Sequence, residues 1–232
     1  MDGLILIDKP KGWTSFDVVN KIRHMVEQSG LNTTGKKRFP VGHTGTLDPL
    51  ATGLLVIVLG NYTKRAPELT KLDKTYEVTM RLGQTSTSGD EEGEKSFVSK
   101  VEPSLQEVAK NMKFYRGEIM QTPPAFSAIK INGKRAYKLA REGSEVKIEP
   151  RKVTIHRIVL DDYNYPYVQF TAGVSSGTYI RTLVEDIGEK LTTGAYMSDL
   201  RRTEVGSFKI DDALKMEGLS AEALYHHVQT LA

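Results

Sequence analysis

The stretch GHTGTLDPLATGLL, residues 42 to 55, joins a glycine-rich polar loop to an uninterrupted apolar run. The run continues as LLVIVLG (54–60), which is typical of a strand buried in a sheet. Three glycines permit backbone conformations that other residues avoid, so we expect a tight loop that can approach a ligand closely. The loop holds one carboxylate, Asp48, and the question is what a single acid does there.

On either side of this stretch, strands and helices alternate without a repeat. Apolar or alternating patterns predict strands at 3–8, 74–83, 152–161, 166–175 and 200–210. Helical periodicity predicts helices at 15–30, 104–113 and 178–191 and a last one capped by Ser220. Because no regular strand–helix–strand order occurs, we predict an α+β fold with a mixed, mainly antiparallel central sheet flanked by helices.

Local signals refine these boundaries. Ser15 is the predicted N-cap of the first helix, and Gly30 is its predicted stop. The acidic segment 85–96 is predicted to be a flexible turn region. The Asn132-Gly133 pair predicts a tight turn that leads into a short basic helix, KRAYKLARE.

Composition limits the class of protein. The 232 residues fit one domain (1–232), and the absence of cysteine excludes thiol chemistry and favours a cytoplasmic location. The longest apolar run is too short to span a membrane. The five histidines lack metal-ligand spacing, so we expect no metal.

A basic segment at about 122–152 is the best candidate for an insertion. Residues 130–152 carry eight basic and three acidic side chains, a net charge of +5 against +3 for the whole chain. Basic charge mixed with aromatic residues suits a nucleic acid partner, while a solvated charged surface is the alternative. The residues expected to meet phosphates are Lys130, Lys134, Arg135 and Lys138.

Asp48 and Arg181 invite a functional interpretation and a structural one. An Asp before a Pro is usually a turn residue. Arg181 falls in the first turn of its predicted helix, where the helix dipole disfavours a cation, so an anionic partner should compensate. That partner is either a surface glutamate or Asp48, and the residues alone leave both open.

Six blocks of sequence together resemble the TruB family of tRNA pseudouridine synthases. They span nearly the whole chain in the family's order. The blocks are LILIDKPKGWTSFDVV (4–19), VGHTGTLDPLATGLLVIVLG (41–60), KTYEVTMRLG (74–83), TPPAFSAIKINGKRAYKLAREG (122–143), SSGTYIRTLVEDIG (175–188) and MSDLRRTEVGSF (197–208).

The resemblance implies a reaction and a partner. Members isomerise uridine 55 in the TΨC stem-loop of tRNA to pseudouridine after flipping the base, with no cofactor. It further implies a pseudouridine synthase fold, a thumb-like insertion that closes over the RNA and a monomer without a protein partner. The chain stops where many relatives continue into a C-terminal PUA-type RNA-binding domain, so we expect that domain to be absent. The rival functions are a noncatalytic RNA-binding or tRNA-folding protein and a uridine N-glycosidase.

The resemblance also implies a role for individual residues. Asp48 matches the catalytic aspartate, Tyr76 the tyrosine that stacks on the target base, and Arg181 the arginine that pairs with the aspartate. His43 matches the histidine that inserts into the opened RNA loop. Tyr179 and Leu200 correspond to pocket residues around the flipped uridine.

Overall fold

The structure is a computed structural model that describes residues 1–30, 32, 38–127, 129–131, 133–136, 139, 142 and 148–231. The chain divides into two compact units. Unit 1 comprises Met1–Tyr76 and Leu200–Ala232, and unit 2 comprises Glu77–Asp199. Two strands, β4 (Lys74–Leu82) and β12 (Ala195–Val205), carry residues of both units. The sequence predicts that both units belong to one catalytic domain, and this stays a prediction.

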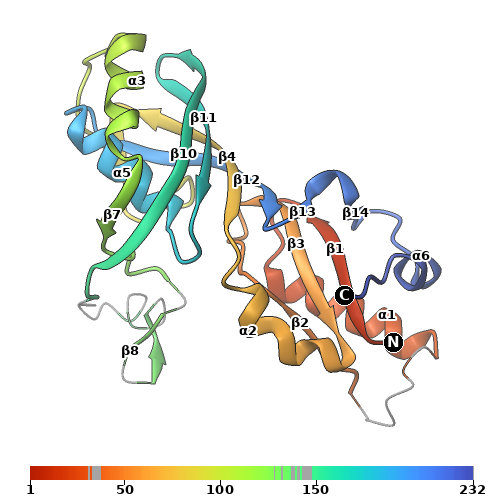
Figure 1. Ribbon diagram of the computed structural model, residues 1–232. Coiled ribbons are helices and arrows are strands. Elements are labelled where there is room, and N and C mark those ends of the chain that lie inside the picture. Colours follow the sequence, from red (N-terminus) through yellow and green to blue (C-terminus); the bar gives the residue numbers. More distant parts are fainter. Residues whose placement is uncertain are drawn as a thin grey trace. The chain divides into compact units, whose positions relative to one another are not determined.

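Unit 1 is a sheet with helices packed on it (Figure 1). Its strands follow the order β14-β1-β3-β12-β4, with β2 on β3 and β13 on β12. The β1–β3, β2–β3 and β12–β13 pairs are antiparallel, whereas β1–β14 and β3–β12 are parallel. The remaining elements of this unit are β1 (Gly3–Lys9), α1 (Ser15–Gln28), β2 (Val41–His43), β3 (Thr52–Leu59), α2 (Ala66–Leu69), β13 (Phe208–Lys209), β14 (Leu214–Lys215) and α6 (Ala221–His226).

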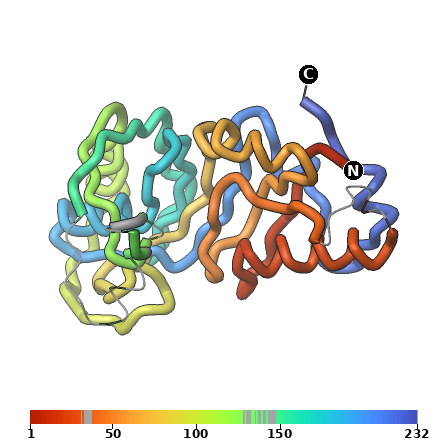
Figure 2. Tube along the Cα trace, turned by 90° about the horizontal axis from the view of Figure 1, so that it is seen from below, coloured from red at the N-terminus to blue at the C-terminus, as the bar shows by residue number. Residues whose placement is uncertain are grey.

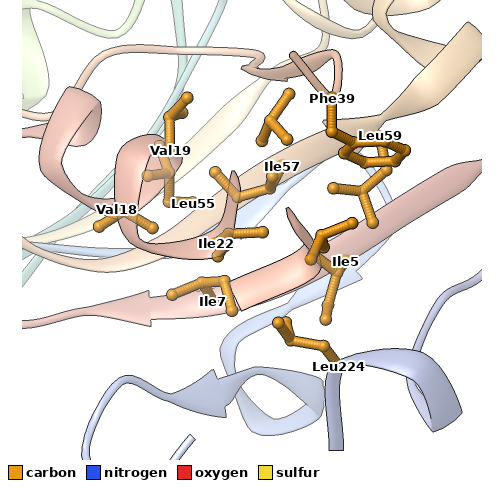
Figure 3. Packing of buried hydrophobic residues seen from close by; sticks show 12 residues of the cluster. Ile5, Ile7, Val18, Val19, Ile22, Phe39, Leu55, Ile57, Leu59 and Leu224 are labelled. Atoms are coloured by element: carbon orange, nitrogen blue, oxygen red, sulfur yellow. The ribbon is translucent and has the colours of Figure 1, made fainter. Parts of the chain in front are cut away.

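Strands β1 and β3 are buried on both faces, which explains their continuous apolar sequences. Alternate side chains point to opposite faces of a strand. One set packs with α1 in a cluster drawn in Figure 3, which includes Ile5, Ile7, Ile22, Leu55 and Ile57. The intervening residues form a second cluster with α2, which includes Leu4, Leu6, Leu54, Val56 and Leu69.

Helix α1 begins one residue earlier than the sequence predicted. Thr14, not Ser15, is the N-cap: its side chain accepts from the Asp17 N–H, and the Asp17 carboxylate accepts from the Thr14 N–H in return. The Ser15 hydroxyl instead contacts the backbone of Leu47. Gly30 follows the C-cap residue with φ +74°, so its predicted role as the stop is confirmed.

The two ends of unit 1 lie side by side. Leu4 in β1 and Gln229 exchange backbone hydrogen bonds of 2.9 Å in each direction. The last segment of the chain therefore runs beside the first strand (Figure 2). No helix in the described part of the chain is long and apolar enough to cross a membrane.

Unit 2 is a second portion of sheet, in the strand order β12-β4-β11-β10-β7. The β10–β11 and β10–β7 pairs are antiparallel. Helices α3 and α5 both belong to this unit (Figure 1). The Tyr115 hydroxyl links them, because it donates to the Asp186 carbonyl at 2.6 Å. The elements are β5 (Gln84–Ser86), β6 (Lys95–Phe97), α3 (Leu105–Phe114), β7 (Gly117–Gln121), β8 (Lys130–Ile131), β9 (Lys134–Arg135), β10 (Arg151–Asn164), β11 (Tyr167–Val174) and α5 (Ile180–Lys190).

Most predicted elements of unit 2 are present, and two local predictions hold in part. Turn residues occupy the middle of segment 85–96, as predicted, and its two ends pair in the β5–β6 hairpin. Strands β8 and β9 are joined by a tight turn at Gly133, as predicted, and Lys134 and Arg135 pair as β9 with β8. Ala136 and Leu139 are helical, so the predicted helix begins after these two residues. The insertion expected at 122–152 starts where β7 ends, and its last two residues belong to β10. The predicted α+β class with a mixed, mainly antiparallel sheet is confirmed.

Candidate active site

Asp48 lies half-buried in the loop between β2 and β3, and the neighbouring backbone is tightly held. The Ser15 hydroxyl accepts from the Leu47 N–H at 2.8 Å and donates to the Leu47 carbonyl at 3.1 Å. The Thr44 N–H donates to the Val56 carbonyl at 3.1 Å. The Ala51 N–H donates to the backbone carbonyl of Asp48. These anchored backbone groups hold the chain at Asp48 in a defined position.

Arg202 supports the same loop from β12. Its side chain is almost fully buried, with 2% exposed, and it donates to the carbonyls of Gly45 at 3.0 Å and Leu54 at 2.7 Å. Gly53 lets β3 approach β12 here, because a Cβ at Gly53 would lie 2.2 Å from the Arg202 carbonyl oxygen. Gly53 also has φ +102°, which other residues rarely adopt. Arg202 therefore joins both ends of the Asp48 loop.

Lys9 is the second buried cation beside the loop. It is completely buried, and its ammonium donates to the carbonyls of Pro10, Trp13 and Pro49, at 3.0, 2.6 and 3.4 Å. Burial lowers the pKa of Lys9 to about 8, an effect that the Asp48 charge opposes and the Arg202 charge reinforces. Lys9 therefore lies close enough to Asp48 for the two charges to interact.

The other residues expected in unit 1 lie on strands β2, β12 and β4. Burial, aided by the Arg202 charge, lowers the pKa of His43, so its imidazole is neutral at neutral pH. Leu200 is buried, and its carbonyl accepts from the Thr52 hydroxyl at 3.5 Å, immediately after the loop. Tyr76 is 9% exposed on β4, with the alternating burial that the sequence predicted.

Unit 2 holds Arg181 in the first turn of α5. Its guanidinium is 7% exposed and lies 3.4 Å from the carboxylate of Asp90, which is 3% exposed. It also donates to the carbonyls of Ser88 at 3.0 Å and Phe126 at 2.8 Å. The expected anionic compensation is thus met in part by Asp90. Asp48 belongs to unit 1, so its pairing with Arg181 stays a prediction.

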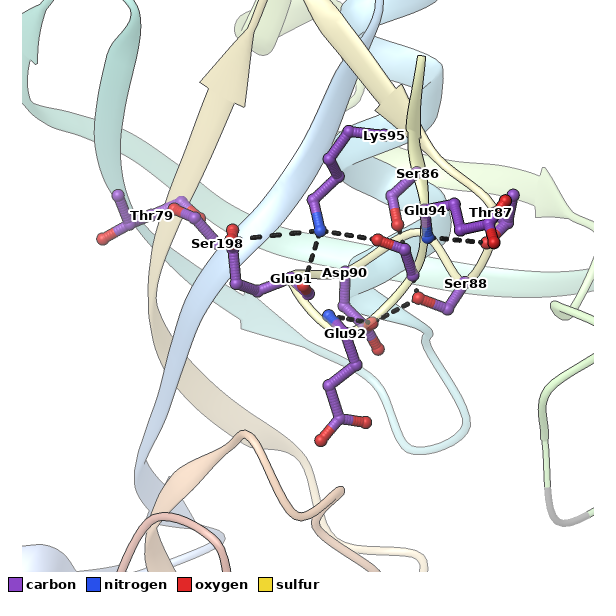
Figure 4. Close-up of polar contacts among 11 residues, drawn as sticks. Thr79, Ser86, Thr87, Ser88, Asp90, Glu91, Glu92, Glu94, Lys95 and Ser198 are labelled. Carbon is purple, nitrogen blue, oxygen red and sulfur yellow. Dashed lines mark hydrogen bonds and ion pairs between the residues drawn. The ribbon is translucent and has the colours of Figure 1, made fainter.

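Asp90 is itself fixed by the β5–β6 hairpin, as Figure 4 shows. One oxygen of its carboxylate accepts from the Ser88 hydroxyl and from the Glu92 N–H at 3.1 Å. The Met197 N–H donates to the Gly89 carbonyl at 3.0 Å, which ties the turn to β12. The other carboxylate oxygen faces Arg181, so the hairpin orients the acid toward the guanidinium.

The remaining predicted residues differ in how far the structure describes them. Tyr179 is the N-cap residue of α5. Lys134 is exposed on β9. The structure describes only the backbone of Lys130 and Arg135, and Lys138 lies outside the described residues. The residues predicted for the catalytic site and the uridine pocket therefore fall into a group in unit 1 and a pair in unit 2. The first comprises His43, Asp48, Tyr76 and Leu200, and the second comprises Tyr179 and Arg181.

Sequence reasoning missed Lys9, Arg202 and Asp90 as supporting residues. Lys9 ends an apolar strand, and a charge there is a usable signal because it needs buried partners. Arg202 lies in a polar part of β12, SDLRRTE, which gives no such signal. Asp90 gave no comparable signal, because a short acidic stretch usually faces solvent.

Comparison with known proteins gives two family matches. The family described as TruB family pseudouridylate synthase (N terminal domain) matches residues 32–180. The family described as tRNA pseudouridylate synthase B C-terminal domain matches residues 181–231. Together the two matches cover most of the chain.

Relatives and solved structures agree with these matches. The chain is 41% identical to tRNA pseudouridine synthase B of Clostridium kluyveri over 98% of this chain and 75% of that protein. It is 42% identical to the protein of the same name from Phocaeicola vulgatus, over 92% and 90%.

A solved Cbf5-Nop10-Gar1 complex contains a chain of similar fold, with a TM-score of 0.71 and 29% identity over 96% of this chain. This chain spans about half of that one, 54% of its length. A structure of an H/ACA RNP bound to a substrate RNA containing 2'-deoxyuridine gives a TM-score of 0.68 at 28% identity. The expected resemblance and fold are confirmed, and the chain belongs to the TruB family of pseudouridylate synthases.

Proposed function

We propose that this protein isomerises uridine 55 in the TΨC loop of tRNA to pseudouridine, with Asp48 as the catalytic acid group. Family membership supports a pseudouridine synthase acting on tRNA, since the similar curated proteins carry that name. The catalytic role of Asp48 is supported by the structure of its loop. The backbone on either side of Asp48 is anchored to Ser15, Arg202 and Lys9.

The reaction needs an ionised group, and it involves no oxidation or reduction. The bond from C1′ to N1 breaks, the uracil turns, and C1′ joins C5, while the hydrogen on C5 leaves as a proton and N1 gains one. One carboxylate can act as a nucleophile toward C1′ or C6, or it can promote loss of the C2′ proton. Lys9 and Arg202 place two cations beside the loop, through their hydrogen bonds to the carbonyls of Pro49 and Gly45.

Aromatic and apolar residues fit the handling of the base. Taking a base out of its stack costs a few kcal/mol, and stacking on an aromatic ring returns about 1–3 kcal/mol. Tyr76 supplies such a ring with little further ordering, because it is already 91% buried on β4. We assign Tyr179 and Leu200 to the pocket around the uracil and His43 to the opened RNA loop. Arg181 is assigned to orient the acid.

The test is incubation with tRNA labelled with tritium at C5 of uridine. Isomerisation releases tritiated water, N-glycosidase activity releases labelled uracil, and a noncatalytic RNA-binding protein releases neither. Replacing uridine 55 alone should abolish the release. Tritium release that persists without uridine 55 would contradict the assigned position, and labelled uracil would contradict the reaction.

A further inference from the structure

Gln121, the last residue of β7, holds the backbone of Tyr179 from both sides. Its side chain is 1% exposed. Its Nε2 donates to the Tyr179 carbonyl at 3.0 Å, and its Oε1 accepts from the Tyr179 N–H at 2.7 Å. The carboxamide therefore satisfies both backbone groups of one residue, as a neighbouring strand would, and fixes the backbone of Tyr179 in space.

Arg151 holds the ring of the same tyrosine. It is the cross-strand partner of Gln121 where β10 pairs with β7. The central carbon of its guanidinium lies 5.0 Å from the centre of the Tyr179 ring, within the range of a cation–π contact. The guanidinium also donates to the Gly177 carbonyl, which ties it to the loop before α5. One cross-strand pair thus contacts Tyr179 at its backbone and at its ring.

The position of Tyr179 explains why such a clamp is needed. Tyr179 is the N-cap residue of α5, and no side chain caps this helix end. Ser, Thr, Asp or Asn would ordinarily stabilise an N-cap, and tyrosine lacks a side chain that can do so. The contacts from Gln121 instead hold the backbone of the N-cap residue itself, and this keeps an aromatic ring at the helix end.

We propose that Gln121 and Arg151 are positioning residues that preset Tyr179 for contact with the target uracil. The inference rests on the proposed function, because it takes Tyr179 as a residue of the uridine pocket. A ring held before binding loses less freedom when the base arrives, and correct placement of the reacting base is worth up to about 100-fold in rate. Affinity for tRNA depends instead on phosphate contacts elsewhere.

The first experiment measures single-turnover pseudouridine formation and tRNA affinity for wild type, Gln121→Met, Tyr179→Leu and the double variant. Methionine keeps the length of the side chain and removes both hydrogen bonds. We expect Gln121→Met to lower the rate constant about 10- to 100-fold with the dissociation constant for tRNA unchanged. Gln169→Met, at an exposed position on β11, is the matched control and should behave as wild type.

The double variant separates positioning from general support of the fold. If Gln121 acts through the ring, Gln121→Met should have little further effect once Tyr179→Leu has removed that ring. An equal loss of rate in both backgrounds would overturn the proposal, as would a wild-type rate for Gln121→Met. If wild type itself releases no tritium, the proposed function fails, whereas an active wild type with an indifferent Gln121 refutes the positioning role alone.

Gln121→Glu covers the case in which the methionine variant does not fold. A protonated carboxyl group offers one donor and one acceptor, as the carboxamide does, while a carboxylate cannot donate to the Tyr179 carbonyl. Burial favours the protonated form. The rate of Gln121→Glu relative to wild type should therefore recover as the pH falls from about 8 to about 6. A ratio that does not change with pH would contradict the proposal.

Discussion

At the scale of single residues, the charge of Asp48 is what the proposed chemistry requires. Asp48→Asn keeps the size of the side chain and removes the anion. We expect a folded protein that binds tRNA and forms no detectable pseudouridine, because an amide is too weak a nucleophile or base to open the glycosidic bond. Melting temperature, tRNA affinity and tritium release should be measured on one preparation. Near wild-type turnover would refute the catalytic role, and loss of folding would favour a structural turn.

Lys9 predicts a pH dependence of stability. Its pKa is about 8 in the folded chain and near 10.5 when exposed, so between these values the unfolded chain binds more protons. The free energy of unfolding should therefore gain a contribution that rises from about pH 8 to about pH 10. Urea unfolding across this range should show a smaller rise for Lys9→Met than for wild type. Parallel curves would mean that Lys9 is not desolvated as the structure indicates.

At the scale of elements, the β5–β6 hairpin contacts Arg181 through one carboxylate. Asp90→Asn keeps an oxygen for the Ser88 hydroxyl and the Glu92 N–H, and it removes the charge that faces Arg181. Removing one member of a buried ion pair costs about 3–5 kcal/mol of stability. We expect a lower melting temperature and a lower kcat, with tRNA affinity less affected.

The matched control for this prediction is Glu91→Gln. Glu91 lies in the same hairpin and forms a 3.9 Å ion pair with Lys95, with its side chain half exposed. An exposed pair contributes at most about 1 kcal/mol, so stability and kcat should change little. Equal effects of the two variants would mean that the hairpin contributes only its fold.

Arg181→Lys tests the other member of the pair. Lysine keeps the positive charge but loses the planar group that reaches Asp90 and the carbonyls of Ser88 and Phe126 together. We expect a folded protein with kcat reduced by about 100-fold or more. Circular dichroism and single-turnover assays would check this, and wild-type turnover would remove Arg181 from the catalytic assignment.

At the scale of the whole molecule, local patterns predicted elements well and long-range partners poorly. The strands β1 and β3 and the capped helix α3 follow from apolar runs and the Ser104–Glu107 capping box, which involve neighbouring residues. The contacts of Arg202 with Gly45 and of Gln121 with Tyr179 join distant segments, so no local pattern encodes them. The site residues themselves were suggested by resemblance, which supplies this missing long-range information.

The last prediction concerns the whole chain's interaction with tRNA. If Lys130, Lys134, Arg135 and Lys138 meet phosphates, replacing all four by alanine should weaken binding and flatten its salt dependence. Each lost phosphate contact reduces the slope of log K against log salt by about 0.7–0.9, so the loss of four contacts should reduce it by about 3 to 3.6. The matched control replaces four exposed lysines elsewhere, Lys21, Lys71, Lys110 and Lys209.

Both variants lose four positive charges, so a reduced slope confined to the insertion variant assigns the phosphate contacts to the insertion. Equal falls would show that net charge alone sets the salt dependence, and an unchanged slope would make the insertion a solvated surface.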